Sequence, residues 1–295
     1  METTFVGICS IDLYSQINRL PDTGETLHGI GLNRGFGGKA PNACAQFAFL
    51  SDEKHKPQLL TVVGNDSDGR EIEEHFKEIG VSTELLQHTD SKPSGLAICF
   101  VLDGGESAIV IHPCPITLEM VNKNIDKIKS SKIVVTNFEV EEAVATEVMR
   151  IGRSSGCKTI LNVSPMPKNP SVELLKDADI VILNEVEMKQ FGSLDELFAA
   201  GVECVINTQG PNGANICQKG KEIVHVPSPK VHAIDTTGAG DSFLGSFTYC
   251  LSKGMDYIEA ARIACITASI SVTGVGTQGS YAHRDHELLK DILPK

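Results

Sequence analysis

Short apolar runs rich in Val and Ile alternate with segments of helical spacing along most of the chain. The runs predict buried strands at Thr4–Ser10, Leu59–Val63, Ile133–Asn137, Thr159–Val163, Ile180–Asn184 and Cys204–Thr208. The segments between them predict helices at Asn42–Leu50, Gly69–Ile79, Glu141–Arg150, Glu185–Phe191 and Leu194–Ala200. This alternation indicates an α/β fold with a mostly parallel central sheet flanked by helices on both faces. In such sheets, ligands bind beyond the carboxyl ends of the strands.

Two stretches do not follow this alternation. Residues 13–36 combine glycines, Pro21 and turn-forming polar residues with short β-like pieces. Residues 94–112 predict a hairpin, with strands Gly95–Leu102 and Ser107–His112 and a turn at residues 103–105. Neither stretch has a helical partner, so we expect them to pair as a small projecting β-sheet. No linker or repeat divides the chain, which predicts one domain over residues 1–295.

Composition narrows the possible partners. The chain has 295 residues, 26 of them basic and 38 acidic, and its net charge of −12 argues against a nucleic-acid or membrane-surface partner. No apolar run approaches the roughly 20 residues that span a bilayer. The N-terminus lacks a basic signal region, and the nine cysteines include no C-x-x-C pair. We therefore expect a cytoplasmic protein, with the nucleus as an additional location if the source is a eukaryote.

The run Asp235-Thr-Thr-Gly-Ala-Gly-Asp241-Ser-Phe contains the most specific chemistry. Phe243, Leu244, Phe247 and Leu251 recur at helical spacing, so Gly238, Ala239 and Gly240 precede or open a helix at Asp241. Backbone N–H groups and the helix dipole favour an anion there. Asp241 could accept a proton from a nucleophilic hydroxyl beside that anion. A generic G-x-G-D string is more often a turn whose Asp caps a helix.

The longer string resembles the C-terminal signature of the PfkB, or ribokinase-like, family of sugar and nucleoside kinases. The resemblance implies that Asp241 is the catalytic base and that the amides of residues 238–241 face the transferring phosphate. It also implies that the small sheet is a lid over the sugar and that lids join two subunits as a homodimer. Two other nucleotide motifs are excluded. The chain has no G-x-x-x-x-G-K-[ST] loop, and its G-x-G-x-x-G letters at 274–279 follow a predicted helix, Ala260–Ile270, instead of a strand.

Phe36-Gly-Gly-Lys-Ala-Pro-Asn42 resembles the N-terminal signature of the same family, which implies that Gly38, Lys39 and Asn42 bind sugar. The chain departs from the family at Ala40-Pro41, and proline removes one N–H donor. The resemblance also implies sugar contacts from Ser10, Asp12 and Glu139. On local grounds Asp12 could equally be a turn residue, and Glu139 could be the acidic start of a helix.

Further segments resemble the elements of the family that bind the nucleotide and the cations. The N-x-x-E element implies that Asn184 acts on phosphate and that Glu187 holds Mg²⁺ through water, although a lone N-x-x-E is usually a capped helix. The loop Thr208-Gln-Gly-Pro-Asn-Gly213 resembles the ATP loop of the family. The implied ATP-binding residues are Asn184, Thr208, Gly210, Pro211, Asn212, Gly213, Gly240 and Cys265. The implied K⁺ ligands are Asp235, Thr237, Ser271, Gly274, Gly276 and Ser280.

Within the family, Lys39 and the segment Gly276–Ser280 are most similar to the members that act on ribose. The resemblance therefore implies ATP-dependent phosphorylation of D-ribose at its 5-hydroxyl, with Mg²⁺ and K⁺ as cofactors. The alternatives are a PfkB-family kinase for another sugar or a nucleoside, and a non-catalytic sugar-binding protein on the same scaffold. Aromatic residues make up 5% of the chain and Trp is absent, which fits a small polar substrate.

Overall fold

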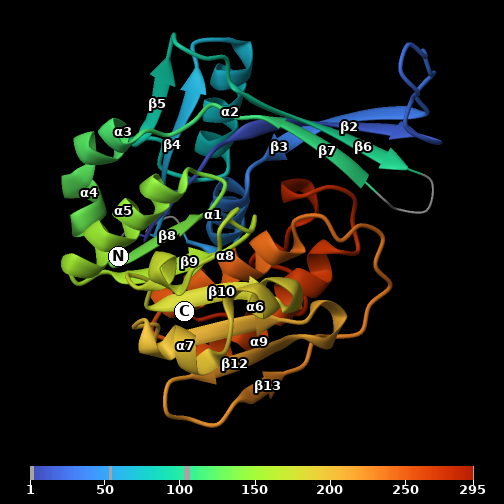
Figure 1. The fold of residues 1–295 in the computed structure, drawn as a ribbon. Coiled ribbons are helices and arrows are strands. Elements are labelled where there is room, and N and C mark those ends of the chain that lie inside the picture. Colours follow the sequence, from blue (N-terminus) through green and yellow to red (C-terminus); the bar gives the residue numbers. More distant parts are fainter. Residues whose placement is uncertain (1–2, 53–54, 103–106, 295) are drawn as a thin grey trace.

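The computed structural model describes residues 3–52, 55–102 and 107–294, and its centre is a nine-stranded sheet (Figure 1). The strand order is β13-β12-β11-β10-β9-β8-β1-β4-β5. All neighbouring strands run parallel except β11–β12 and β12–β13. The strands are β1 (Thr3–Val6), β4 (Gln58–Gly64), β5 (Leu86–Thr89), β8 (Ile133–Asn137), β9 (Lys158–Asn162), β10 (Ile180–Asn184), β11 (Cys204–Thr208), β12 (Ala214–Gln218) and β13 (Val224–Val226). The predicted, mostly parallel sheet is confirmed.

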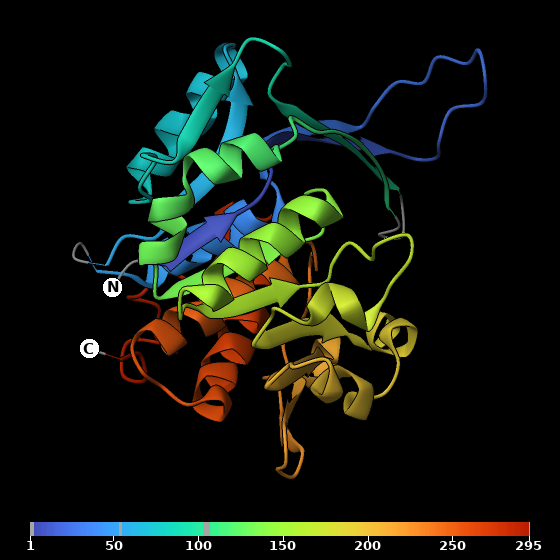
Figure 2. The same cartoon turned by 60° about the vertical axis from the view of Figure 1, so that its left-hand side comes forward.

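Helices cover both faces of this sheet, as predicted (Figure 2). One face packs against α1 (Lys39–Leu50), α2 (Ser67–Glu78), α8 (Ala239–Ser252) and α9 (Tyr257–Ser271). The other face packs against α3 (Leu118–Lys123), α4 (Ile125–Ser130), α5 (Glu142–Ser154), α6 (Glu185–Phe191) and α7 (Leu194–Ala199). Successive strand residues point to opposite faces, so each strand contributes to the apolar core on both faces. Ile133 and Val135 point into the core on the first face, whereas Val134 points into the core on the other.

A second, four-stranded sheet projects from the body as the predicted lid (Figure 1). Its order is β3-β2-β6-β7, with β2 and β6 parallel and the other pairs antiparallel. The strands are β2 (Ser10–Ile17), β3 (Gly31–Gly37), β6 (Gly95–Leu102) and β7 (Ser107–His112). The turn predicted at residues 103–105 lies outside the described residues.

The prediction of one continuous strand at Thr4–Ser10 is wrong. β1 ends at Val6, and Ser10 begins β2 in the lid sheet, so the chain changes sheets between these residues. Gly7 lies so close to Ala40 of α1 that an added Cβ would be only 2.5 Å from the Ala40 Cβ. Close packing against α1 therefore requires a glycine at the position where the chain leaves β1. Because the chain changes sheets, Asp12 lies on a lid strand instead of in a turn after the first strand.

Several element boundaries also differ from the pattern. α1 begins at Lys39, three residues before the predicted start, because Pro41 is tolerated in the first turn, where its missing N–H has no helical acceptor. α9 begins at Tyr257, capped by the Asp256 side chain. Short elements gave no periodic signal: α3, α4, β5, β12, β13 and the 3₁₀ turns Val172–Leu175, Gly210–Asn212 and Gln278–Ser280. No helix in the described part of the chain is long and apolar enough to cross a membrane.

Candidate active site

The predicted site residues converge at the edge where the parallel strands of the large sheet end. Glu139 follows β8, Asn184 ends β10, and Thr208 ends β11 directly beside Asn184 in the register. The first turns of α1 and α8 meet at the same edge, since Asn42 of α1 contacts Asp241 of α8. The lid contributes Asp12, whose carboxylate lies against Gly37 at the end of β3. This is the edge at which open α/β sheets bind their ligands.

The D-T-T-G-A-G-D run forms the start of α8, as the sequence predicted. Gly238 is the N-cap with φ +74°, and Ala239, Gly240 and Asp241 form the first turn. A side chain at Gly238 would be strained and would approach the Tyr281 hydroxyl to 2.6 Å. The first N–H groups of a helix have no intrahelical acceptor and carry the positive end of the dipole. This turn can therefore bind a phosphate group.

The Asp241 carboxylate is buried beside the Lys39 ammonium and the Asn42 side-chain amide. It is 5% exposed, and its Oδ2 accepts a hydrogen bond of 2.9 Å from Nδ2 of Asn42. Burial raises the pKa of Asp241, while the Lys39 ammonium and the Asn42 hydrogen bond oppose the rise. A carboxylate with a raised pKa is a stronger base than an exposed one, which suits it to take a proton from an alcohol.

Asp12 is held in place by two hydroxyl groups. Ser10 Oγ donates to Oδ1 at 2.6 Å, and the Tyr14 hydroxyl donates to Oδ2 at 3.2 Å. Burial raises the pKa of Asp12, and the nearby Asp241 contributes to the rise. An added Cβ at Gly37 would overlap this carboxylate, so the glycine makes its position possible. The sequence reasoning predicted Ser10 and Asp12 but missed Tyr14 and Gly37.

Glu139 lies at the N-terminus of α1. Its Oε2 accepts a 2.7 Å hydrogen bond from the backbone N–H of Lys39, and its own N–H donates to Asn137 Oδ1. Gly38 precedes this turn with φ +99°, and a Cβ there would overlap the carbonyl oxygen of Ile8. Burial raises the pKa of Glu139 to about 7, partly offset by the Lys39 ammonium and N–H. The predicted sugar-binding residues are thus neighbours.

The raised pKa of Glu139 predicts a stability change that depends on pH. The native state holds a proton on Glu139 between its ordinary pKa of 4.5 and about 7, so its ionisation destabilises the fold as pH rises through this range. Glu139→Gln removes that ionisation and keeps an oxygen for the Lys39 N–H. We expect the variant to gain stability over the wild type at pH 8, on the order of 2 kcal/mol, and to show a smaller gain at pH 5. Urea unfolding at both pH values measures the difference; an equal difference at the two values would contradict it.

A cavity of about 630 Å³ adjoins the first turn of α8. Seven of the eight predicted ATP-binding residues line it: Thr208, Gly210, Pro211, Asn212, Gly213, Gly240 and Cys265. Ala239, predicted as part of the anion site, also lines it. The sequence reasoning missed the rest of its wall, which comes from the irregular segment after β13 and from α8 and α9: Ser228, Pro229, Lys230, Val231, Ala233, Thr236, Phe243, Ala268, Ser269 and Val272. Its size and mixed lining suit a nucleotide.

Asn184 is not among the residues that line this cavity. Its Oδ1 accepts from the N–H groups of Val186 and Glu187, and Glu187 Oε2 accepts from the Asn184 N–H, which makes a capping box for α6. Glu187 is 6% exposed and is among the carboxylates whose charge raises the pKa of Lys39. The roles of Asn184 at phosphate and Glu187 at magnesium stay predictions.

The residues predicted to bind K⁺ come from two loops that contact each other. Asp235 Oδ1 accepts from the Thr237 backbone N–H and hydroxyl, and its Oδ2 accepts from the Gly276 N–H. Ser280 Oγ donates to the Gly276 carbonyl, and Gly274 lies against Ser280. Ser271 ends α9, directly before this second loop. The donor set consists of hard oxygen atoms, which fits an alkali cation; within the described ranges, no three His, Cys, Asp or Glu side chains form a metal cluster.

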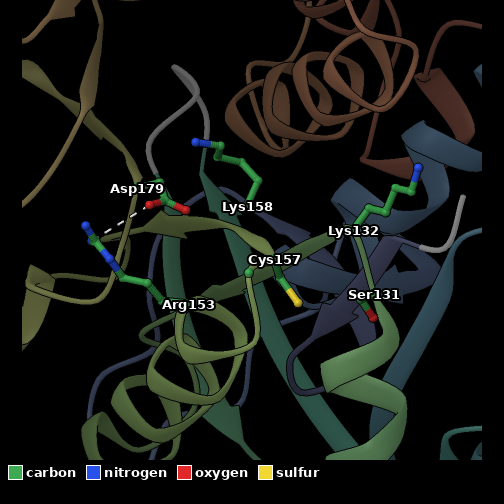
Figure 3. A pocket seen from close by; sticks show the side chains of 7 residues that line it. Ser131, Lys132, Arg153, Cys157, Lys158 and Asp179 are labelled. Carbon is green, nitrogen blue, oxygen red and sulfur yellow. Dashed lines mark ion pairs between the residues drawn. The ribbon is translucent and has the colours of Figure 1, made fainter.

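A second hollow, of about 500 Å³, lies at the opposite edge, where β8, β9 and β10 begin (Figure 3). Three of the charged side chains in its lining, Arg153, Lys158 and Asp179, already pair with protein groups. Arg153 donates to the carbonyls of Lys176 and Gly201 and pairs with Asp179, and Lys158 pairs with Glu203. We therefore assign the candidate site to the carboxyl edge.

Comparisons with known proteins agree with this geometry. The chain matches the pfkB family of carbohydrate kinases over residues 2–284. It is 32% identical to ribokinase of Mus musculus over 297 residues, covering 95% of this chain and 91% of that protein. It is 28% identical to deoxyribokinase of Salmonella typhi over 95% of both proteins. The structure of Arabidopsis thaliana ribokinase complexed with ribose and ATP superposes with a TM-score of 0.84 at 25% identity, covering 99% of this chain and 98% of that one. This chain belongs to the PfkB family of carbohydrate kinases.

Proposed function

We propose that this kinase transfers the γ-phosphoryl group of ATP to the 5-hydroxyl of D-ribose, giving D-ribose 5-phosphate and ADP. One observation carries the proposal. The buried Asp241 carboxylate lies in the first turn of α8, where it accepts from Asn42 of the polar cluster and directly follows Gly240, which lines the cavity suited to a nucleotide. The similarity to ribokinases, one of them crystallised with ribose and ATP, supports ribose as acceptor.

The residues divide into three roles in this proposal. Ser10, Asp12, Gly38, Lys39, Asn42 and Glu139 bind the sugar hydroxyls. Asp241 takes the proton from the 5-hydroxyl as its oxygen attacks the γ-phosphorus, and the bond from that phosphorus to the bridging oxygen of ADP breaks. The backbone N–H groups of residues 238–241 stabilise negative charge that develops on the transferring group.

Magnesium and potassium complete the proposal. Glu187, near Lys39, would hold Mg²⁺ through water, and the bound ion would neutralise charge on the phosphates. The residues at 235–237 and 271–280 would hold K⁺, which would order the two loops beside the first turn of α8.

The potassium proposal predicts a cation-dependent rate. Replacing K⁺ by tetramethylammonium at equal ionic strength is expected to reduce kcat by about tenfold or more, because the organic cation is too large for the oxygen-lined loops. Steady-state ADP production measures the effect. An unchanged kcat after the exchange would contradict the proposed K⁺ site.

The alternative acceptors are deoxyribose, another sugar and a nucleoside, and the similarity to a deoxyribokinase specifically favours testing deoxyribose. A coupled assay of ADP production across ribose, 2-deoxyribose, fructose and adenosine decides between them. We expect the highest kcat/KM with ribose. A clear preference for another acceptor would replace ribose in the proposal, and sugar binding without ADP production would indicate a non-catalytic sugar-binding protein.

We further propose a homodimer joined through the lid and a reducing, cytoplasmic location. Large apolar side chains of the lid are exposed, with Leu32 at 71% and Ile109 at 54%, which supports a partner surface. A monomer mass by light scattering would contradict the dimer.

The proposed location rests on the cysteines. All nine cysteines are buried and free, which supports a reducing compartment. Cell fractionation tests this location, and recovery of the protein in the secretory or extracellular fraction would contradict it.

A further inference from the structure

A row of hydrogen-bonded side chains leads from Asp241 to the surface of α2. Asn42 Nδ2 donates to Asp241 Oδ2 at 2.9 Å, and Gln278 Nε2 donates to Asn42 Oδ1 at 2.9 Å. The row ends at His75, whose Nε2 lies 2.7 Å from Gln278 Oε1. Asn42 and Gln278 are 4% and 6% exposed, so water can hardly substitute for either partner. The four side chains come from α8, α1, the turn at 278–280 and α2.

The carboxylate fixes the direction of every bond in this row. An ionised Asp241 can only accept, so the Asn42 amide must present its NH₂ group there and its oxygen to Gln278. Gln278 must then present its own NH₂ group to Asn42 and its oxygen to His75. His75 must carry a proton on Nε2 to complete the row. A reversed Asn42 amide would place its oxygen against the carboxylate, which is repulsive.

We propose that His75 and Gln278 are positioning residues that lock the Asn42 amide with its N–H toward Asp241. This inference deepens the proposed function and rests on Asp241 being the catalytic base. The locked N–H keeps the base in one orientation, with its second oxygen free for the acceptor hydroxyl. Without the donor at His75, the Gln278 amide can reverse, and the Asn42 oxygen then loses its donor, which leaves Asp241 alone to hold the Asn42 amide in place.

The same residues connect the base to the lid. The His75 ring stacks on Phe36 of β3, with ring centres 3.8 Å apart and planes 9° apart. Thr277, next to Gln278, donates through Oγ1 to the Phe36 carbonyl at 3.1 Å. His75 therefore has two separable contacts, a stack on the lid strand and a hydrogen bond into the row. Substitutions can remove one of them and keep the other.

Two substitutions of His75 separate these contacts. His75→Phe keeps a ring to stack on Phe36 but has no N–H for Gln278. His75→Gln loses the ring but can place an amide N–H near the position of Nε2. With ribose and ATP, we expect His75→Phe to lower kcat by about tenfold, the effect of one lost buried hydrogen bond, and His75→Gln to recover most of it.

A purely packing role of His75 predicts the opposite order, because Phe preserves the stack and Gln does not. Rates are compared with the thermal unfolding midpoint of each variant, at a temperature well below both midpoints. A His75→Phe variant as fast as the wild type, or a His75→Gln variant slower than His75→Phe, would overturn the inference. A wild-type protein that produces no ADP with any acceptor would instead overturn the proposed function.

Gln278→Glu tests the middle of the row with a side chain of the same shape. A carboxylate accepts from His75 but has no N–H to donate to Asn42 Oδ1. We expect kcat to fall by about tenfold or more while KM for ATP stays within about twofold, because the nucleotide cavity is lined by other residues. An unchanged kcat would overturn the inference, and so would a loss confined to KM for ATP.

Discussion

Asp241→Asn is expected to reduce kcat by about 10²–10⁴ and to leave sugar binding in place. Asparagine has the same shape as the carboxylate, and its oxygen can still accept from Asn42 Nδ2, so the local packing survives. The amide cannot take a proton from the acceptor hydroxyl. Steady-state ADP production gives kcat, and calorimetric titration with ribose gives the affinity.

Asp179→Asn is a matched control for this variant. Asp179 is also a buried aspartate, 7% exposed, but it binds Thr159 at the opposite edge of the sheet. This control is expected to lower stability and to keep kcat per folded molecule near that of the wild type. If Asp241→Asn turned over at a rate close to the wild type, Asp241 would not be the base.

Lys39→Met is expected to be the second most damaging change, with kcat lowered by about 10²–10³, the usual cost of removing one preorganised charged donor from such a site. The Lys39 ammonium lowers the pKa of both Asp241 and Glu139. Its loss raises the pKa of both carboxyls, so a higher pH is needed to ionise the base. The acidic limb of the kcat–pH profile should therefore move to higher pH.

Lys132→Met is the control for a lost lysine. Lys132 is exposed and lies by the hollow at the opposite edge of the sheet (Figure 3). Its profile is expected to coincide with that of the wild type. An acidic limb that stays in place or moves to lower pH in Lys39→Met would show that the ammonium does not govern the ionisation of the base.

The large sheet and its flanking helices could be predicted because the spacing of apolar residues along the chain matches the faces that are buried in the fold. The segment Ile133–Asn137 is apolar on both faces because helices cover both faces of the sheet, and the run alone reports this. The start of α8 was predictable for a similar reason. Gly238 marks the turn before the helix, and the apolar residues after Asp241 recur at helical spacing. The division into one domain over 1–295 stays a prediction.

The missed features depend on contacts between residues distant in the sequence. The local pattern around Gly7 does not show that the chain leaves the large sheet here and enters the lid sheet at Ser10. Gln278 and Asn42 are 236 positions apart, and His75 is recognisable only once α2 lies beside them. The residues around the nucleotide cavity after β13 belong to an irregular segment with no periodic signal. Fold-level packing decides these neighbours, and spacing along the chain does not.

The most direct measurement of the central claim is the position of the transferred phosphorus. Ribose labelled with ¹³C at carbon 5 is incubated with the wild-type protein, ATP, Mg²⁺ and K⁺, and followed by NMR. We expect a carbon–phosphorus coupling to appear at carbon 5 in step with equimolar ADP. ADP formed without that coupling, or a folded protein that forms neither, would contradict phosphoryl transfer to the 5-hydroxyl at this site.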